Sequence, residues 1–193
     1  EHIVPLAAAQ DHKRALDGDL GENTGGMGAY SPAPVFSDAV EKQVLERVVY
    51  PAIRGMASDG HPYQGVLYVG LMIDAQGEAR VVEFNVRFGD PETQPLMVRL
   101  QDDLLPLLDA SARGTLGRFE GEALSWGEAA TCVVLASGGY PRSYETGKAI
   151  EGLAEAAAGE GVAIFHAGTK RGGDAGYVTA GGRVLGVTAS GAD

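Results

Sequence analysis

Residues 83–94 read EFNVRFGDPETQ, and polar side chains at Glu83, Asn85 and Arg87 alternate there with apolar ones. Successive side chains of a β-strand point to opposite faces of a sheet, so the alternation predicts a half-buried strand. The apolar side chains that this pattern turns toward the core are Val82, Phe84, Val86 and Phe88. An ordinary amphipathic strand with a solvated polar face would produce the same pattern.

The polar face of this strand carries groups that suit a metal and phosphate site. The Glu83 carboxylate and the Asn85 carboxamide offer oxygen ligands to Mg²⁺. The Arg87 guanidinium can clamp a phosphoryl group or a carboxylate. The row therefore indicates metal-assisted phosphoryl transfer, in which positioning and charge neutralisation supply most of the rate enhancement.

A second strand is predicted beside the first. Apolar runs at 65–73 and 79–88 flank a short glycine-containing loop, which predicts a β-hairpin. On the first run Tyr68, Gly70 and Met72 share one face. There Met72 offers a polarisable surface to an adenine ring and Gly70 leaves room for a ligand; alternatively, Met72 fills the core and Gly70 marks a bulge.

The composition is that of a globular chain with one large domain or two small ones. It has 193 residues, 45% of them hydrophobic, and a formal net charge of -11. This charge argues against nucleic acid or an anionic membrane as a non-specific partner. The single cysteine, Cys132, excludes an intrachain disulfide framework, and its apolar neighbours predict that it packs in the core. We expect a cytoplasmic protein, because no run of eighteen apolar residues is present.

Two segments near the start of the sequence contain further candidate ligands. In QDHKR (10–14), Lys13 and Arg14 suit a phosphate or carboxylate, and Asp11 could hold one of them or a substrate amine. In GENTGGMGAYSP (21–32) the glycine amides could cradle an anion. The side chains that could add hydrogen bonds there are Asn23, Thr24 and Ser31. A solvated charge cluster and a flexible turn are the alternatives, and the glycine pattern matches no standard nucleotide motif.

Before the hairpin, the sequence predicts a strand at 1–9, a long functional loop at 10–34, and then a helix. Ser37 or Asp38 would cap this helix. Its apolar stripe consists of Val40, Val44, Leu45, Val48, Val49, Ile53 and Met56. We expect a kink at Pro51 and an end at Gly55 or Gly60.

After the hairpin, residues 93–113 predict a helix that breaks near Asp102 and Asp103, with Pro106 in the first turn of the second piece. Short strands are predicted beyond, at 129–136, 162–166, 176–180 and 183–188. A glycine-rich turn is expected at 137–141 and an alanine-rich helix or loop at 153–159. The change of pattern predicts a domain boundary near residue 120.

Seven motifs together resemble one known family. In order they are QDHKR, GENTGGMGAYSPAPV, YVGLMID, EFNVRFGDPETQ, ASGGYP, FHAGTK and GGRVLGVTA. They resemble the phosphoribosylamine–glycine ligase family of ATP-grasp enzymes over nearly the whole chain. The resemblance implies an α+β fold: residues 1–120 would be the C-terminal part of an ATP-grasp domain, an antiparallel sheet with helices, and 121–193 a small mixed β domain.

The resemblance also implies an activity in purine biosynthesis. ATP would phosphorylate the carboxylate of glycine, and the amine of 5-phosphoribosylamine would attack the glycyl phosphate, giving glycinamide ribonucleotide. The partners would be these small molecules, without nucleic acid or membrane, and the protein would be a monomer or weak dimer.

Carried over to this sequence, the family pattern makes Glu83 and Asn85 the ligands of Mg²⁺ or Mn²⁺ and Arg87 the group that stabilises the transferring phosphoryl group or acyl phosphate. Met72 would contact ATP. The residues placed on the substrate side are Asp11, Lys13, Arg14, Asn23, Thr24, Gly25, Gly26, Asp90 and Glu92, of which the last two would orient Arg87 or bind an amine.

Some elements of the family have no counterpart in this sequence. An acid that other ATP-grasp enzymes often place on the partner strand is replaced by Gly70, and the nearest acid, Asp74, lies in the hairpin loop, which argues against it as a ligand. The N-terminal domain and the first ATP-grasp lobe, with its glycine-rich loop and lysine, are not present. We therefore expect a C-terminal portion that is inactive alone. The alternatives are a non-catalytic module and a ligase for another carboxylate.

Overall fold

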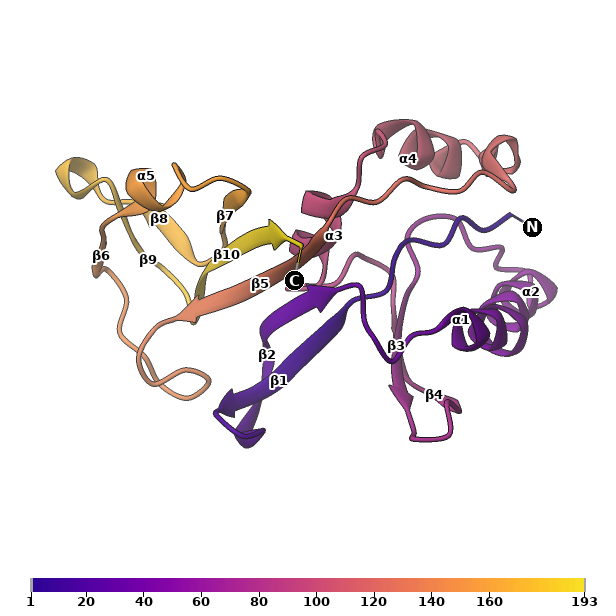
Figure 1. The fold of residues 1–193 in the computed structure, drawn as a ribbon, viewed down its shortest axis with the longest axis horizontal. Coiled ribbons are helices and arrows are strands. Elements are labelled where there is room, and N and C mark those ends of the chain that lie inside the picture. Colours follow the sequence, from indigo (N-terminus) through magenta and orange to yellow (C-terminus); the bar gives the residue numbers. More distant parts are fainter. Residues whose placement is uncertain (1, 193) are drawn as a thin grey trace. The chain divides into compact units, whose positions relative to one another are not determined.

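The computed structural model describes residues 2–192 (Figure 1). They form two compact units, and the chain passes between them several times. The first unit contains the described residues up to 8, together with 33–89 and 100–126. The second contains 9–32, 90–99 and the described residues from 127 onward. Each unit therefore combines segments that are distant in sequence.

The first unit contains the predicted helix. α1 (Asp38–Val44) begins after the predicted cap Ser37, whose hydroxyl accepts a hydrogen bond of 3.4 Å from the Val40 amide. A π-helical turn, Leu45–Val49, continues directly into α2 (Tyr50–Ser58).

This helix is irregular in its middle and ends close to one of the two predicted glycines. The irregular π-helical turn comes just before Pro51, which lies in the first turn of α2. The helix ends at Ser58, and Gly60 follows with a φ of 82°. Gly60 therefore marks the end, whereas Gly55 lies inside α2.

The predicted hairpin is confirmed as β3 (Tyr68–Ile73) and β4 (Ala79–Asn85), which pair antiparallel. Gly70 lies opposite Glu83 and Leu71 lies opposite Val81, so Val82 is an extra residue on β4. This bulge supports the alternative that Gly70 marks an irregularity in the ladder. β4 ends at Asn85, short of the predicted end at residue 88.

The prediction that Val82, Phe84 and Val86 face a core is wrong. Their exposed fractions are 65%, 46% and 74%. A two-stranded hairpin buries a face only where another layer packs on it. In the described part of this unit α1 meets β4 at its start, where the Ala79 amide donates a hydrogen bond of 2.9 Å to Gln43 Oε1.

The helix predicted at 93–113 is broken as expected. α3 (Thr93–Arg99) belongs to the second unit and α4 (Leu105–Ala112) to the first. Asp103 Oδ1 accepts a hydrogen bond of 2.9 Å from the Leu105 amide, and Pro106 lies in the first turn of α4. A 3₁₀ turn, Leu116–Phe119, follows in the first unit.

The second unit is built on a five-stranded antiparallel sheet in the order β1-β2-β5-β10-β7 (Figure 1). Its strands are β1 (Gln10–Leu16), β2 (Leu20–Ser31), β5 (Ala129–Ala136), β7 (Val162–His166) and β10 (Arg183–Gly191). α3 packs against β2, β5 and β10. The buried residues Leu96, Cys132 and Leu185 belong to this layer, so Cys132 lies in the core as predicted.

The prediction of a long loop at 10–34 is wrong, because this segment forms the hairpin β1–β2. Its glycines permit close approach of strands. A Cβ atom added at Gly28 would lie 2.7 Å from the carbonyl oxygen of Cys132 on β5. Residues 2–9, predicted as a strand, form none, because an extended segment becomes a strand only through backbone pairing.

A small sheet with the order β6-β9-β8 completes the second unit. It consists of β6 (Ala149–Ile150), β9 (Tyr177–Thr179) and β8 (Thr169–Arg171). The short helix α5 (Leu153–Ala156) and a 3₁₀ turn, Gly173–Ala175, lie between its strands in sequence.

All four predicted strands of the C-terminal part are confirmed, as β5, β7, β9 and β10; β6 and β8 were not predicted, and both are very short. The expected turn at 137–141 is also present, with a hydrogen bond of 3.0 Å from the Tyr140 amide to the Ser137 carbonyl. The compact units and the predicted domains divide the chain differently, and the domain boundary near residue 120 stays a prediction. Among the described residues, no helix is long and apolar enough to cross a membrane.

Candidate functional site

Glu83 and Asn85 lie on one face of β4, two positions apart, with Gly70 and Tyr68 opposite them on β3. Glu83 is exposed and Asn85 is half-buried. In the described part of the chain neither side chain has a hydrogen-bond or ion-pair partner. Their oxygen atoms are therefore available to a ligand.

The two side chains fit a divalent cation that is held mainly by a phosphorylated ligand. No group of three or more His, Cys, Asp or Glu residues that could hold a metal exists among the described residues. Mg²⁺ commonly takes one or two protein oxygen ligands and completes its shell with substrate phosphates and water. Glu83 and Asn85 would supply such a pair.

Arg87 lies outside the regular strand, two residues beyond the end of β4. The expected row of three therefore does not continue along one strand. Arg87 Nη1 donates a hydrogen bond of 2.9 Å to the carbonyl oxygen of the next residue, Phe88. Its assignment to a transferring phosphoryl group stays a prediction.

Gly70 and Met72 lie on the partner strand β3. Met72 is 68% exposed, which does not fit the alternative that it fills the core. A Cβ atom at Gly70 would lie 3.0 Å from Glu83 Cγ, so the space beside Gly70 is occupied by the Glu83 side chain. Gly70 thus accommodates a candidate metal ligand, and contact between Met72 and ATP stays a prediction.

Asp74 stabilises the hairpin turn. Its Oδ1 accepts hydrogen bonds of 3.0 Å from the backbone amides of Gln76 and Glu78. This arrangement, in which a short polar side chain bonds the backbone just beyond it, is typical of turns. It gives Asp74 a structural role, in agreement with the argument against it as a metal ligand.

The second unit holds the predicted substrate-side residues of the N-terminal segments. On β1 the side chains of Asp11 and Lys13 form an ion pair. Arg14 Nη1 donates a hydrogen bond of 2.8 Å to the carbonyl oxygen of Gly21 across the hairpin. All three groups are thus engaged or paired within the β1–β2 hairpin.

The glycine-rich part of β2 is held by several hydrogen bonds. Thr24 Oγ1 donates to the Lys13 carbonyl at 2.8 Å and accepts from the Gly26 amide at 3.0 Å. The Gly25 amide donates to the Tyr140 hydroxyl at 3.1 Å. The amides of Gly25 and Gly26, predicted to cradle an anion, therefore have partners within the protein. For Asn23, which lies opposite Arg14, a substrate contact stays a prediction.

Ser31, the third predicted polar donor of this segment, lies in the core. Arg99 Nη1 donates a hydrogen bond of 2.6 Å to its hydroxyl oxygen, and Arg99 Nε donates to the Glu128 carbonyl at 3.0 Å. Burial lowers the pKa of Arg99 from its ordinary value. These contacts hold β2, α3 and the start of β5 together, which is a structural role for Ser31.

Asp90 and Glu92 begin the segment that leads into α3. Asp90 Oδ1 accepts a hydrogen bond of 2.9 Å from Gln94 Nε2, and its Oδ2 forms an ion pair of 2.9 Å with Arg183 Nη2. Glu92 is buried. The ion-pair partner of Asp90 is therefore Arg183. The sequence did not predict this pair, although the motif GGRVLGVTA contains Arg183. The role of both acids toward a substrate stays a prediction.

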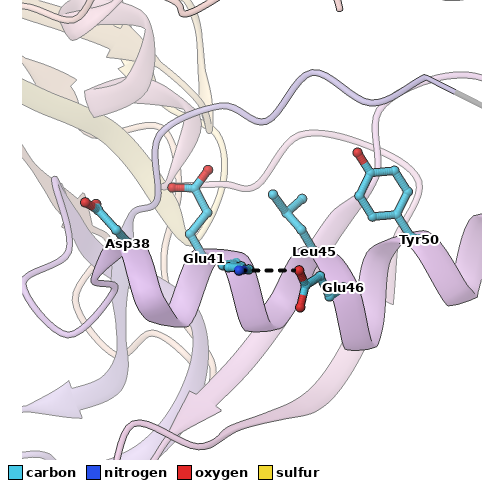
Figure 2. A pocket seen from close by; sticks show the side chains of 6 residues that line it. Asp38, Glu41, Leu45, Glu46 and Tyr50 are labelled. Carbon is cyan, nitrogen blue, oxygen red and sulfur yellow. Dashed lines mark ion pairs between the residues drawn. The ribbon is translucent and has the colours of Figure 1, made fainter. Parts of the chain in front are cut away.

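A surface hollow occurs on the helical segment of the first unit (Figure 2). The residues that line it are Asp38, Glu41, Lys42, Leu45, Glu46 and Tyr50. Lys42 Nζ forms an ion pair of 3.9 Å with Glu46. None of the predicted site residues lies in this hollow, and its excess of carboxylates would repel nucleotide phosphates.

Comparison with known proteins finds two family models. "Phosphoribosylglycinamide synthetase, ATP-grasp (A) domain" matches residues 1–93, and "Phosphoribosylglycinamide synthetase, C domain" matches residues 130–193. The predicted boundary near residue 120 falls between the two matched segments.

Similar sequences carry the name phosphoribosylamine–glycine ligase. The protein of Escherichia coli (strain K12) is 53% identical over 194 residues, and that of Vigna unguiculata is 51% identical over 196 residues. The chain spans 44% and 62% of these two relatives, while the matches cover 99% and 100% of the chain itself.

Solved structures are also similar to this chain. The crystal structure of phosphoribosylamine–glycine ligase from Thermotoga maritima matches with a TM-score of 0.76 and 34% identity, over 97% of this chain and 44% of that one. N5-carboxyaminoimidazole ribonucleotide synthetase from Thermus thermophilus matches with a TM-score of 0.54 and 16% identity, over 87% of this chain and 38% of that one, a likeness in fold alone.

Proposed function

We propose, because the chain belongs to the phosphoribosylglycinamide synthetase family of ATP-grasp ligases, that it supplies the C-terminal part of an enzyme that joins glycine to 5-phosphoribosylamine. The product would be glycinamide ribonucleotide, an intermediate of purine biosynthesis. The observation that carries the proposal is the pair Glu83 and Asn85, which lie on one strand face and have no hydrogen-bond or ion-pair partner within the described residues.

The reaction would proceed in two transfers. A carboxylate oxygen of glycine attacks the γ-phosphorus of ATP, and ADP leaves. The amine of 5-phosphoribosylamine then attacks the carbonyl carbon of glycyl phosphate, phosphate leaves, and the nitrogen loses a proton. Both steps build negative charge on phosphoryl oxygens, so cationic groups that meet this charge stabilise the transition states.

The residues of this chain would divide the work as follows. Glu83 and Asn85 would hold Mg²⁺ or Mn²⁺, which when bound neutralises charge on the nucleotide phosphates. Arg87 would orient the transferring phosphoryl group, because a guanidinium can donate two parallel hydrogen bonds to it. Met72, exposed on the same face of the hairpin as Glu83, would pack on the adenine ring.

The experiment uses a hybrid in which this chain replaces the matched segment of the Escherichia coli ligase. The double variant E83A/N85A should lower the ligation rate by on the order of 10³-fold, because the metal contributes several kcal/mol to the transition state. The melting temperature should stay unchanged, since neither side chain has a hydrogen-bond or ion-pair partner among residues 2–192.

The matched control is E78Q in the same hairpin. Glu78 is an exposed acid whose partner is Arg47, at 3.4 Å, and exposed pairs of this kind contribute little to stability. Its removal should leave ligation unchanged. Full activity in E83A/N85A, or an equal loss in E78Q, would contradict the metal assignment.

A further inference from the structure

Two side chains from the C-terminal segment, Tyr140 and Arg183, hold the glycine-rich part of β2. We infer that Tyr140 and Arg183 form a clamp that positions Thr24–Gly26 for binding of a non-nucleotide substrate. This inference rests on the proposed function and deepens it. Both clamp residues lie in the segment 130–193, and Thr24–Gly26 lies within 1–93, yet all belong to the same compact unit.

Arg183 holds Gly25 and Asp90 together. Its Nη1 donates to the Gly25 carbonyl at 2.8 Å and to the Asp90 carbonyl at 2.8 Å, with the Gly26 carbonyl at 3.4 Å. Its Nη2 donates to Asp90 Oδ2 at 2.9 Å. The Arg183 side chain is 23% exposed, so these charge-assisted bonds are partly shielded from water. One guanidinium thus fixes two segments that are distant in sequence.

Tyr140 holds the other backbone polar group of Gly25. Its hydroxyl accepts a hydrogen bond of 3.1 Å from the Gly25 amide. A Cβ atom at Gly182 would lie 2.3 Å from Tyr140 Cδ2, so the Tyr140 ring rests directly on the backbone next to Arg183. Gly25 is therefore held at both its amide nitrogen and its carbonyl oxygen.

The glycines of the held segment are explained by the clamp. A Cβ atom at Gly25 would lie 3.0 Å from Arg183 Cζ. At Gly26, where φ is 118°, it would lie 2.4 Å from Pro91 Cδ. Glycine at these two positions lets the backbone approach the guanidinium and the proline ring closely. Gly25 and Gly26 are thus needed for close contact within the protein.

The clamp also reaches the charged pair on β1. Thr24 Oγ1 bonds the backbone of Lys13, and the Lys13 side chain is ion-paired with Asp11. Moving Thr24–Gly26 would therefore shift the backbone that carries a candidate cation for the phosphate or carboxylate of a substrate. Tyr140 and Arg183 act through this backbone, so we class them as positioning residues.

The kinetic test uses the hybrid ligase with Y140F and, separately, R183K. Phenylalanine keeps the ring but leaves the Gly25 amide without its acceptor. Lysine has a single ammonium group, which cannot reproduce the planar set of guanidinium hydrogen bonds to Gly25 and Asp90. Both variants should raise the KM for glycine or 5-phosphoribosylamine by ~3- to 10-fold. This factor corresponds to the free energy of about one hydrogen bond. The KM for ATP should not change.

The matched control is R142Q. Arg142 also joins the C-terminal segment to the hairpin, through an ion pair of 2.7 Å with Glu22, but both side chains are exposed. The hydrogen bonds described above for Thr24–Gly26 involve neither of them. R142Q should leave every KM unchanged. Unchanged KM values in Y140F and R183K would overturn the inference, as would a lower kcat and melting temperature without a change in KM.

Hydrogen exchange on the 193-residue chain tests the clamp without any activity. The Gly25 amide should exchange at least ~5-fold faster in Y140F than in the wild type or in R142Q, because it has lost a hydrogen bond worth about that factor. Equal exchange would overturn the clamp. If the wild-type hybrid shows no ligation, the proposed function fails, and the exchange result alone determines whether the clamp exists.

Discussion

At the scale of single residues, burial controls the chemistry of Cys132. The thiol is completely buried in the second unit, opposite Thr188 of β10. Burial raises the pKa of Cys132 above its ordinary value of 9.0, because the thiolate would lose its hydration. The thiol therefore stays protonated and unreactive in the folded protein, which agrees with a packing role.

This pKa shift predicts how stability depends on pH. Well below pH 9.0 the thiol is protonated in both states and has no effect on stability. Above that pH it ionises in the unfolded chain but not in the folded one, so the free energy of unfolding should fall by up to ~1.4 kcal/mol per pH unit.

Urea unfolding between pH 7.5 and 10 measures this slope. In C132A the slope should be smaller, even though the cavity lowers stability at every pH. Tyr63, whose pKa is also raised by burial from 10.0, affects stability in the same direction near the upper end of this range, and it does so equally in wild type and C132A. Equal slopes in wild type and C132A would contradict the assignment.

At the scale of elements, β2 and β5 can pair closely because Gly28 of β2 has no side chain. Gly28 pairs with Val133, and a Cβ atom there would lie 2.7 Å from the carbonyl oxygen of Cys132. Backbone atoms of a paired strand cannot move without breaking ladder hydrogen bonds. Glycine at this position therefore sets how closely the hairpin β1–β2 joins the sheet.

We predict that G28A lowers the free energy of unfolding by ~1–3 kcal/mol, the usual cost of overpacking. Chemical denaturation followed by far-UV circular dichroism measures it. G138A is the matched control, because no atom lies within 4 Å of a Cβ at Gly138. It should change stability by less than ~0.5 kcal/mol, and an equal loss in both variants would refute the steric argument.

At the scale of the whole molecule, the chain spans 44% of the Thermotoga maritima ligase, whose fold it shares. Among the described residues the candidate metal site contributes one carboxylate and one carboxamide, and no cluster of three acidic, histidine or cysteine ligands is present. Two neighbouring oxygen ligands hold Mg²⁺ weakly unless phosphates complete the shell and are themselves held.

The 193-residue chain should therefore bind Mg²⁺-ATP weakly, with a dissociation constant of roughly 1 mM or more. Isothermal titration calorimetry on the free chain and on the hybrid ligase measures the difference. Micromolar affinity in the free chain would contradict this expectation and would favour a nucleotide-binding module that works by itself.

Sequence reasoning succeeded where neighbouring residues control the backbone. Ser37 caps α1, Pro106 lies in the first turn of α4, and a short loop joins β3 to β4 in the predicted hairpin. Each of these features depends on hydrogen bonds or φ angles within a few residues, so the local sequence contains the information.

Sequence reasoning failed where one residue type can serve different structural roles. The glycines of 21–28 indicated either a loop that cradles an anion or a flexible turn, but they lie in a strand, where Gly25, Gly26 and Gly28 let other groups approach. Alternation on β4 indicated a buried face, although burial of Val82 requires a second layer, which no pattern within the strand can specify.

The order of residues thus establishes the turn of the β3–β4 hairpin, the helix ends and the position of Glu83 and Asn85 on one strand face, because these depend on interactions between near neighbours in the chain. The three-dimensional fold alone establishes that Asp90 pairs with Arg183 and that Tyr140 holds Gly25. Such contacts join segments separated by about a hundred residues, and their geometry exists only after strands and helix have packed into one unit.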